Sequence, residues 1–532
     1  MRKRKNYNRI IGKDSLRIPC LIVFLVIMIA GVSSADVRLP KIFTDHMVLQ
    51  REMAVPVWGW ADPGEKVTVE FAGQKVTTTA DTAGKWMLRL AVLKVNALPQ
   101  ELVVRGRNTV KISDVLVGDV WLGSGQSNME FAMRDVENAS VEIAGAEKPL
   151  IRLFTVPRLQ KNQMVDDVDS QWTICSPETV KDFSAVLYLF GRELNTETKI
   201  PIGLIHSSVG GTRIELWTAP EGLEHVPEFA DKAKGIEDAE KHYREQILPK
   251  TLPVLEAWIT KTKAALANGE RVPLTPDWPN HPGLEFGGLY VGMIHPIVPF
   301  GIRGVVWYQG EWNGGENDIY VKRMQALIAG WRKVWRRTEL PFYYVQLARM
   351  PQKDTPPWKG DGLTPTREAQ RRSLAIPHTG MAVIIDLPGS SGWHPPNKQD
   401  VAKRLSLWAL RNEYGRKDLV CSGPLYSGMT VEGSRIRLTF DHTGSGLMVG
   451  TKNGLEPVKP APDQPLNSFA MAGADRKWVL ADAVIDGATV VVSSPEVPKP
   501  VAVRYAYCQD PEGANLYNKE GLPASPFRTD EW

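Results

Sequence analysis

Residues 36–115 alternate between apolar and polar side chains, as strands do when one of their faces is buried. Residues 54–92, AVPVWGWADPGEKVTVEFAGQKVTTTADTAGKWMLRLAV, show this alternation most clearly. Asp-Pro-Gly at 62–64 and Ala-Gly at 83–84 interrupt it and are typical of turns. We therefore predict a small β-sandwich over residues 36–115.

A different pattern begins near Asp119, where short apolar runs alternate with segments of helical periodicity. The predicted strands are 119–125, 150–157, 199–208, 304–310, 341–350 and 380–387. The predicted helices are 127–138, 183–197, about 228–269, 318–337, 367–376 and 397–415, with a further one opening at Thr212. Strands that alternate with helices favour a mostly parallel sheet covered on both faces. The sequence thus predicts a three-layer α/β domain over residues 116–416.

Strand-and-turn sequence returns after residue 416. Residues 426–449 and 488–508 are rich in β-branched and aromatic side chains and are separated by glycine- and proline-containing turns. We predict a C-terminal, sandwich-like β region over residues 417–532. Three regions fit a chain of 532 residues, which is too long for one ordinary core.

The first 35 residues have the composition of a secretory signal peptide. A basic lead, 1–17, precedes an apolar run, 18–32, and the small residues Ser-Ser-Ala, 33–35. The apolar run is short for a membrane span, although an uncleaved N-terminal anchor is the alternative. We expect cleavage before Asp36, export to the periplasm or the extracellular space, and no membrane association afterwards.

Removing residues 1–35 changes the charge of the chain. They hold seven Lys and Arg and one acid, so the remainder carries 57 basic and 59 acidic side chains, a net charge of −2 in place of +4. The basic character of the whole sequence therefore belongs to the signal peptide. A net charge of this size gives no reason to expect a nucleic-acid partner.

Cysteine and histidine spacing gives no sign of a metal centre or a bound cofactor. Cys175, Cys421 and Cys508 follow the signal peptide without a Cys-x-x-Cys pair. Either Cys421 and Cys508 form a disulfide or these thiols are free and buried. The nine histidines form no His-x-His or His-x-x-x-His cluster.

Polar residues and a pair of glycines follow four of the predicted strands, at the sheet edge where ligands bind in α/β folds. They are Ser127 in GQSN, Gly210, Gly211 and Thr212 in VGGT, Gln309, Glu311 and Asn313 in QGEWN, and His394 in PGSSGWHPPNK. Each has a structural interpretation. Ser127 with Glu130, and Thr212 with Glu215, match capping boxes, while Gln309 and Glu311 could satisfy loop amides and His394 could open a helix.

Acyl transfer would use these side chains together. A serine hydroxyl becomes a nucleophile when a neighbouring histidine accepts its proton. The tetrahedral intermediate needs N–H donors, and both a helix N-terminus at Ser127 and a glycine backbone at Gly211 can supply them.

These motifs resemble those of the sialate O-acetylesterase-like carbohydrate esterases of the SGNH hydrolase superfamily, and the likeness extends over nearly all of the mature chain. It is carried by GDVWLGSGQSNME (118–130), IGLIHSSVGGTRIELW (202–217), GVVWYQGEWN (304–313), REAQ (367–370) and HPPNK (394–398). The flanking segments 47–67, MVLQREMAVPVWGWADPGEKV, and 502–532, which ends in SPFRTDEW, also match. The resemblance implies an SGNH or flavodoxin-like catalytic domain that removes acetyl groups from sugar hydroxyls without a cofactor.

The resemblance also implies roles for individual residues. Ser127 matches the nucleophile, and His394 matches the general base. Gly211 matches the oxyanion-hole glycine, which acts together with the N–H of Ser127. Gln309 is the first candidate for a side chain that donates a hydrogen bond to the oxyanion, and Asn313 is the second. Glu311 is expected to be structural.

The chain departs from the family pattern just before the histidine. Family members often carry an aspartate two or three positions earlier, where this sequence has Gly392 and Ser391. The sequence therefore predicts a Ser–His dyad in place of the triad, with Asp386, at the end of the preceding strand, as the alternative orienting acid. Trp312 stands where a small serine is common, and its bulk would narrow the acyl pocket.

Two other functions are consistent with the sequence. One is a lipid or lysophospholipid esterase of the same superfamily, and the other is a non-catalytic carbohydrate-binding protein whose site has decayed. Acetylated sialic acid, xylan and other acetylated glycans all suit the family, so the sequence does not name the sugar. It does not specify the oligomeric state either.

Overall fold

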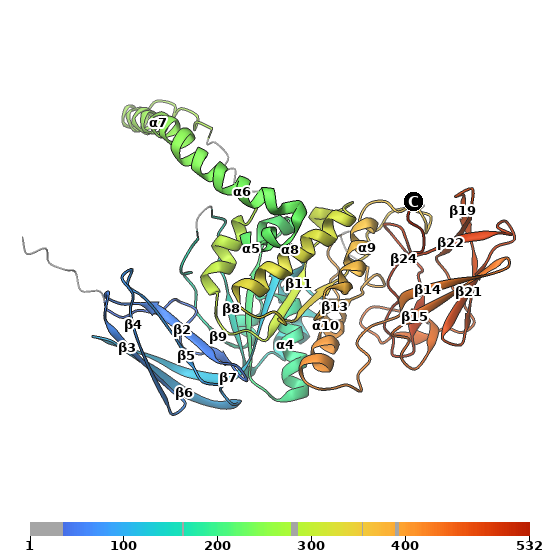
Figure 1. Ribbon diagram of the computed structural model, residues 1–532, viewed down its shortest axis with the longest axis horizontal. Coiled ribbons are helices and arrows are strands. Elements are labelled where there is room, and N and C mark those ends of the chain that lie inside the picture. Colours follow the sequence, from blue (N-terminus) through green and yellow to red (C-terminus); the bar gives the residue numbers. More distant parts are fainter. Residues whose placement is uncertain (1–35, 162–163, 278–285, 354, 389–392) are drawn as a thin grey trace, which may run out of the picture. The chain divides into compact units, whose positions relative to one another are not determined.

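The computed structural model describes residues 36–532 except 162–163, 278–285, 354 and 389–392 (Figure 1). The predicted signal peptide, 1–35, lies outside the described residues, so export stays a prediction. Among the described residues, no helix combines the length and apolar character needed to cross a bilayer. The described cysteines Cys175, Cys421 and Cys508 are all buried free thiols, so the alternative of a Cys421–Cys508 disulfide is wrong.

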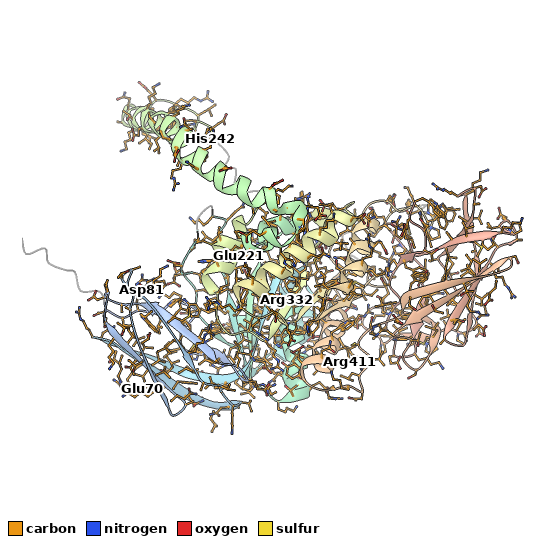
Figure 2. The ribbon with its side chains drawn as sticks, in the orientation of Figure 1. Glu70, Asp81, Glu221, His242, Arg332 and Arg411 are labelled. Carbon is orange, nitrogen blue, oxygen red and sulfur yellow. The ribbon has the colours of Figure 1, made fainter. Side chains whose placement is uncertain are left out.

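The N-terminal region is built of strands, as its alternating pattern predicts. They are β1 (Val48–Gln50), β2 (Val55–Trp60), β3 (Lys66–Phe71), β4 (Gln74–Thr79), β5 (Lys85–Leu90), β6 (Asn96–Arg105) and β7 (Thr109–Gly125). In β5, every second side chain is buried. β2 pairs with β5, and β4, β3, β6 and β7 pair in that order, all antiparallel. Charged side chains such as Glu70 and Asp81 lie on this region (Figure 2).

Strand β7 runs through the predicted boundary at residues 115 and 116. Its first half pairs with β6, and its second half pairs in parallel with β10 (Ile202–Ser208) and β11 (Gly304–Tyr308). Strand β7 therefore belongs both to the N-terminal antiparallel strands and to the centre of the parallel strands that follow. Contacts join residues 36–532 into one unit, and the division into three domains stays a prediction.

The centre of the molecule is a run of parallel strands in the order β13-β12-β11-β7-β10-β8, with β9 antiparallel at the edge. The remaining bounds are β8 (Lys148–Thr155), β9 (Thr173–Cys175), β12 (Phe342–Val345) and β13 (Thr379–Ala382). With the N-terminal strands that join it through β7, the whole sheet has eleven strands and is mixed. The predicted α/β class is confirmed at this level.

Helices cover both faces of the parallel strands. Val305 and Trp307 of β11 pack in the cluster that contains Trp331 of α8 (Asp318–Val334). The alternate residues Val306 and Tyr308 pack in the cluster formed with α4 (Ala185–Thr198) and α10 (Lys398–Glu413). Because successive side chains of a strand point to opposite faces, the sheet is buried on both sides.

The other helices are mostly short. They are α1 (Ser127–Glu130), α2 (Ala139–Ala144), α3 (Pro177–Val180), α5 (Pro220–His225), α6 (Pro227–His242), α7 (Leu248–Asn268) and α9 (Thr364–Arg372). Shorter 3₁₀ or π turns are η1 (Met133–Asp135), η2 (Ile214–Trp217), η3 (Tyr243–Ile247), η5 (Tyr290–Ile294), η6 (His295–Ile297), η7 (Glu311–Asn313) and η8 (Ser373–Ala375). Helices α6 and α7, joined by η3, account for the long predicted stretch at 228–269.

The helix predicted over 127–138 ends at Glu130 instead. The Ser184 hydroxyl donates to the Met129 carbonyl at 2.6 Å, and the Ala185 N–H donates to the Phe131 carbonyl at 2.8 Å. These partners occupy carbonyls that a longer helix would use for its own i+4 hydrogen bonds. Tertiary contacts with the start of α4 therefore limit α1 to one turn.

The C-terminal region is made of antiparallel strands. They are β14 (Leu425–Glu432), β15 (Arg435–Asp441), β16 (Leu447–Thr451), β17 (Lys459–Pro460), β18 (Phe469–Gly473), β19 (Trp478–Leu480), β20 (Asp482–Asp486), β21 (Thr489–Ser493), β22 (Pro500–Tyr505), β23 (Leu516–Asn518) and β24 (Phe527–Arg528). The fully buried Arg367 of α9 joins this region to the α/β core, since its guanidinium donates to the carbonyls of Cys508 and Gln509.

Candidate active site

Ser127 follows β7 at the carboxyl edge of the parallel strands. Gly125 ends β7 with a φ of 138°, and a Cβ there would lie 2.1 Å from the Tyr308 carbonyl oxygen, so the close approach of β7 and β11 requires glycine. Gln126 is the N-cap of α1, and Ser127 is the first helical residue, with no side-chain cap hydrogen bond. The capping-box interpretation of Ser127 is therefore wrong.

The Ser127 hydroxyl contacts His394 instead. Nε2 of His394 lies 2.8 Å from Oγ of Ser127, although 267 residues separate them in the chain. His394 is half-buried, and α10 begins only at Lys398, so His394 does not open a helix. Burial, and secondly the positive charge of Lys398, hold the pKa of His394 below its usual value. The imidazole is therefore neutral at pH 7 and can accept a proton from the hydroxyl.

The VGGT loop after β10 lies beside Ser127. A Cβ built on Gly210 would be 3.3 Å from Cβ of Ser127. The N–H of Gly210 donates to Oε2 of Glu130 at 2.8 Å, and the other carboxylate oxygen of Glu130 accepts from Arg158. Glu130, which the sequence suggested as half of a capping box, thus fixes this loop.

Gly211 keeps its backbone N–H open. Its φ is 72°, a left-handed conformation that favours glycine, and the residue is exposed. Within the described part of the chain, its N–H makes no hydrogen bond to a protein acceptor. This N–H and the free N–H groups at the start of α1 are the backbone donors next to Ser127.

Gln309 and Asn313 do not supply the side-chain donor expected from the sequence. The amide nitrogen of Gln309 donates to the Thr212 carbonyl and to Oδ1 of Asn313, at 3.1 and 2.7 Å. The amide nitrogen of Asn313 donates to Glu215 and Glu316, at 3.0 and 3.1 Å. Both side chains are fully buried with all their N–H groups in use. They hold the loops together and leave no donor for an oxyanion.

Asn128 and Lys398 are the residues that the sequence analysis missed. Asn128 is fully buried, and its amide nitrogen donates to Oε1 of Glu311 at 2.6 Å and to the Trp393 carbonyl at 2.9 Å. Its Oδ1 accepts from Nζ of Lys398 at 2.5 Å. Glu311 thus contacts Asn128, and its expected structural role stays a prediction. The signal was present in the sequence, because Asn128 and Lys398 end the GQSN and HPPNK motifs.

The structure does not bring Asp386 to the imidazole. Its carboxylate forms a two-pronged ion pair with Arg404, at 2.6 and 2.7 Å, and accepts weakly from the Tyr517 hydroxyl at 3.4 Å. Among the described residues, no carboxylate hydrogen bonds to His394. The sequence positions Ser391 and Gly392, where the family often has aspartate, lie outside the described residues.

We expect Asp386→Asn to lower stability and not turnover. The Asp386 and Arg404 side chains are almost entirely buried, so weakening their ion pair should lower the free energy of unfolding by about 3 kcal/mol. The kcat for acetate release should stay within about threefold, whereas loss of a true orienting acid lowers kcat by about 10⁴-fold. Urea unfolding and initial rates of the variant distinguish the two. A fall in kcat beyond about 100-fold in folded protein would assign Asp386 to the site.

Two exposed tryptophans lie at the rim of the site. Trp312 is 59% exposed, and its indole nitrogen lies 3.3 Å from the position of a Cβ on Gly211. Trp393 is 42% exposed and directly precedes His394.

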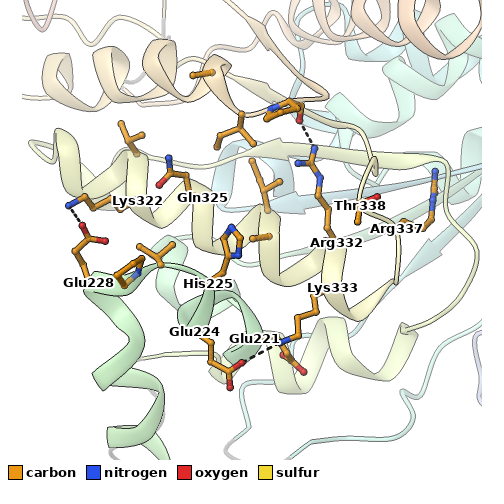
Figure 3. Close-up of a pocket in the computed structure, with 18 of the residues that line it drawn as sticks. Glu221, Glu224, His225, Glu228, Lys322, Gln325, Arg332, Lys333, Arg337 and Thr338 are labelled. Atoms are coloured by element: carbon orange, nitrogen blue, oxygen red, sulfur yellow. Dashed lines mark hydrogen bonds and ion pairs between the residues drawn. The ribbon is translucent and has the colours of Figure 1, made fainter.

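A separate groove of about 1450 Å³ does not include the Ser127–His394 pair. Residues of α5, the start of α6 and α8 line it, and ion pairs Lys322–Glu228 and Lys333–Glu224 cross it (Figure 3). None of the predicted site residues is among its lining residues. The described residues also contain no cluster of three or more His, Cys, Asp and Glu arranged to hold a metal ion.

Comparisons with known proteins are consistent across sequence and structure. Residues 285–394 match the family model described as "Carbohydrate esterase, sialic acid-specific acetylesterase". The chain is 30% identical over 552 residues to the sialate O-acetylesterase of Rattus norvegicus, covering 95% of this chain and 97% of that protein. It is 33% identical over 427 residues to the Homo sapiens sialate O-acetylesterase, with 73% of each chain covered. The crystal structure of a carbohydrate acetylesterase from Xanthomonas citri superposes with a TM-score of 0.74 at 34% identity, covering 93% of this chain and 100% of that one.

Proposed function

This chain belongs to the sialate O-acetylesterase family of carbohydrate esterases, and from that premise we propose that it removes acetyl groups from sugar hydroxyls through a Ser127–His394 acyl-enzyme mechanism. The observation that carries the proposal is the 2.8 Å hydrogen bond between Ser127 Oγ and His394 Nε2. A serine in contact with a neutral imidazole is the arrangement that nucleophilic acyl transfer needs.

Acylation begins when His394 takes the Ser127 proton and the oxygen attacks the acetyl carbonyl. The tetrahedral intermediate collapses, its bond to the sugar oxygen breaks, and the imidazolium of His394 returns the proton to the leaving hydroxyl. Water, deprotonated by the same imidazole, then attacks the carbonyl of the acetyl-enzyme. The bond between the acetyl carbon and Ser127 Oγ breaks, the imidazolium returns the proton to Oγ, and acetate leaves. Each proton that leaves Ser127 or water is thus carried by His394.

The oxyanion is stabilised by backbone N–H groups. Ser127 is the first residue of α1, where N–H groups are free and the helix dipole favours negative charge. The open N–H of Gly211 is the second donor, and Glu130 holds its loop in place through Gly210. Donors fixed before the reaction lower the barrier because they need no reorganisation.

The domain assignment forms part of the proposal. We assign residues 116–416 to an SGNH or flavodoxin-like catalytic domain, flanked by β regions at 36–115 and 417–532. The parallel run of strands and the position of Ser127, Gly211 and His394 after their carboxyl ends support this assignment. We also propose that residues 1–35 direct export to the periplasm or the extracellular space.

An O-acetylated glycan is the substrate class that the site supports best. The two rim tryptophans offer flat apolar faces, on which the C–H faces of sugar rings stack. Relatives named sialate O-acetylesterase make acetylated sialic acid the first sugar to test. Acetylated xylan and other acetylated glycans complete the set of candidates.

The experiment is a measurement of acetate release from acetylated sialic acid, acetylated xylan and ethyl acetate, with ethyl octanoate as the lipid-like ester. We expect acetate release from at least one glycan at a higher kcat/KM than from ethyl acetate. Preference for octanoate over acetate would favour a lipid esterase. Glycan binding without hydrolysis of any ester would favour a decayed carbohydrate-binding site.

We expect Trp312→Ala and Trp393→Ala to weaken glycan binding specifically. Aromatic contacts contribute about 0.5–1.5 kcal/mol each, so KM for the acetylated glycan should rise about threefold to tenfold for each variant. The kinetics with ethyl acetate should change little, because its leaving group has no ring to stack. Trp532→Ala is the matched control, since Trp532 is 40% exposed but contacts Trp478 and Arg476 of the C-terminal region. Equal KM values for all three variants and the wild type would refute sugar stacking.

A further inference from the structure

Lys398 is a fully buried lysine without an ion pair to a carboxylate among the described residues. Its Nζ donates to Oδ1 of Asn128 at 2.5 Å and lies 4.8 Å and 5.1 Å from the ring centroids of Phe131 and Tyr308. Lysine is rarely buried completely, because its charged form loses hydration. Groups kept in such surroundings are candidates for a functional role.

Asn128 connects Lys398 to both partners of the proposed reaction. It directly follows Ser127 in the chain, and its amide nitrogen donates to the carbonyl of Trp393, the residue before His394, at 2.9 Å. The amide therefore bridges the backbone on either side of the Ser127–His394 hydrogen bond. The same nitrogen donates to Oε1 of Glu311 at 2.6 Å, so both ends of the Asn128 amide are hydrogen-bonded.

The charge of Lys398 also acts on the imidazole of His394. Burial lowers the pKa of Lys398 to about 7, although the negative charge of Glu311 raises it. Burial raises the pKa of Glu311. The charge of Lys398 adds to burial in lowering the pKa of His394. Glu311 on η7, His394 on the loop before α10 and Tyr308 on β11 are thus the charged or titratable groups near Lys398. Burial raises the pKa of Tyr308 well above its usual value, so its phenol is neutral, and Phe131 presents an aromatic face.

We propose that Lys398 is a positioning residue that, through Asn128, fixes the Trp393–His394 segment against Ser127. The inference rests on the proposed Ser127–His394 function and extends it. In a Ser-His-Asp triad, a carboxylate bonded to the imidazole holds the ring. In this chain, no carboxylate of the described residues bonds to His394, and the Lys398–Asn128 hydrogen bond holds the backbone next to the ring instead.

The test compares Lys398→Met, Lys398→Gln and the control Lys452→Met in the full chain. Methionine is unbranched and apolar and is one atom shorter than lysine, and it neither donates to Asn128 nor carries charge. Lys452 is a half-buried lysine whose side chain pairs with Asp400 at 2.7 Å, with no contact to the Ser127–His394 pair. The measurements are kcat and KM for ethyl acetate, the pH dependence of kcat/KM, and the midpoint of thermal unfolding.

For Lys398→Met, we expect kcat to fall about 10- to 100-fold, because small misplacements of reacting groups have effects of this size. KM should stay within about twofold. The acid limb of the pH profile, where kcat/KM falls as His394 becomes protonated, should move to higher pH. Removing a positive charge next to His394 raises its pKa. Lys452→Met should leave both kcat and the acid limb close to those of the wild type.

Lys398→Gln separates the hydrogen bond from the charge. Glutamine can donate to Oδ1 of Asn128 but is neutral, so we expect it to recover part of kcat while its acid limb stays at higher pH. This variant also serves if Lys398→Met does not fold. An unchanged kcat and acid limb in either Lys398 variant would overturn the inference, as would equal losses in Lys398→Met and Lys452→Met.

Failure of this inference and failure of the proposed function give different results. If Ser127→Ala is inactive and Lys398→Met is as active as the wild type, only the positioning role is wrong. If Ser127→Ala retains activity, the proposed function itself is wrong, and Lys398 loses its role with it.

Discussion

Replacing Ser127 by alanine is expected to lower kcat for acetate release by about 10⁴- to 10⁶-fold, with the fold intact. Alanine removes the oxygen that attacks the acetyl carbonyl, so no acetyl-enzyme can form. The side chain is small and makes no cap hydrogen bond to α1, so the midpoint of thermal unfolding should change little. The measurement is the initial rate with ethyl acetate and with an acetylated glycan, together with a thermal melt.

Ser124→Ala is the matched control for this variant. Ser124 lies in β7, three residues before Ser127, and its buried hydroxyl has no hydrogen-bond partner among the described residues. Its removal should leave kcat within about twofold, because an unpartnered buried hydroxyl contributes little. A Ser127→Ala rate within tenfold of the wild type would contradict the nucleophile assignment.

The second large effect is expected for His394→Ala, which should lower kcat about 10³- to 10⁵-fold. Without the imidazole, no group takes the Ser127 proton or returns it to the leaving sugar hydroxyl. In the wild type, kcat/KM should begin to fall only at a pH below the usual pKa of histidine. The pKa of His394 is lowered, so its active neutral form persists into mildly acidic solution. That acid limb should disappear in the variant.

His225→Ala is the control for the histidine. His225 is exposed and lines the groove of α5 and α8, away from Ser127. We expect its kcat and pH profile to match those of the wild type. If His394→Ala kept the acid limb of the wild type, another group would be the base.

The sequence was sufficient to predict the general architecture and the proximity of Ser127 and His394. Alternating strands and helices indicate a parallel sheet, and such a sheet collects the residues that follow its strands at one edge. Ser127, Gly211 and His394 each follow a different strand, so their proximity is a consequence of topology. These three residues can be identified as candidates from their positions after strands, without information on side-chain packing.

The hydrogen-bond partners of buried amides could not be predicted in the same way. Gln309 is adjacent to Gly310 in a matching motif, yet its N–H groups are used by Thr212, 97 residues away, and by Asn313. Asn128 lies 270 residues from Lys398, the donor to its side chain. Which donor remains free depends on tertiary contacts that no local pattern contains.

Two further predictions, the end of a helix and the role of Asp386, were wrong for the same reason. The helix expected to reach residue 138 ends at Glu130, because Ser184 and Ala185 take its carbonyl groups. Asp386 was the alternative orienting acid because it ends the predicted strand before His394, but Arg404 on α10 binds its carboxylate. In both cases a partner distant in sequence decides the local structure.

The most direct test of the account is covalent labelling of the full chain with a fluorophosphonate, followed by mass spectrometry of the peptides. The account predicts one phosphonylated residue, Ser127, in parallel with loss of esterase activity, and much slower labelling of His394→Ala. Complete inactivation with the label on another residue, or an active enzyme in which Ser127 is fully labelled, would contradict it.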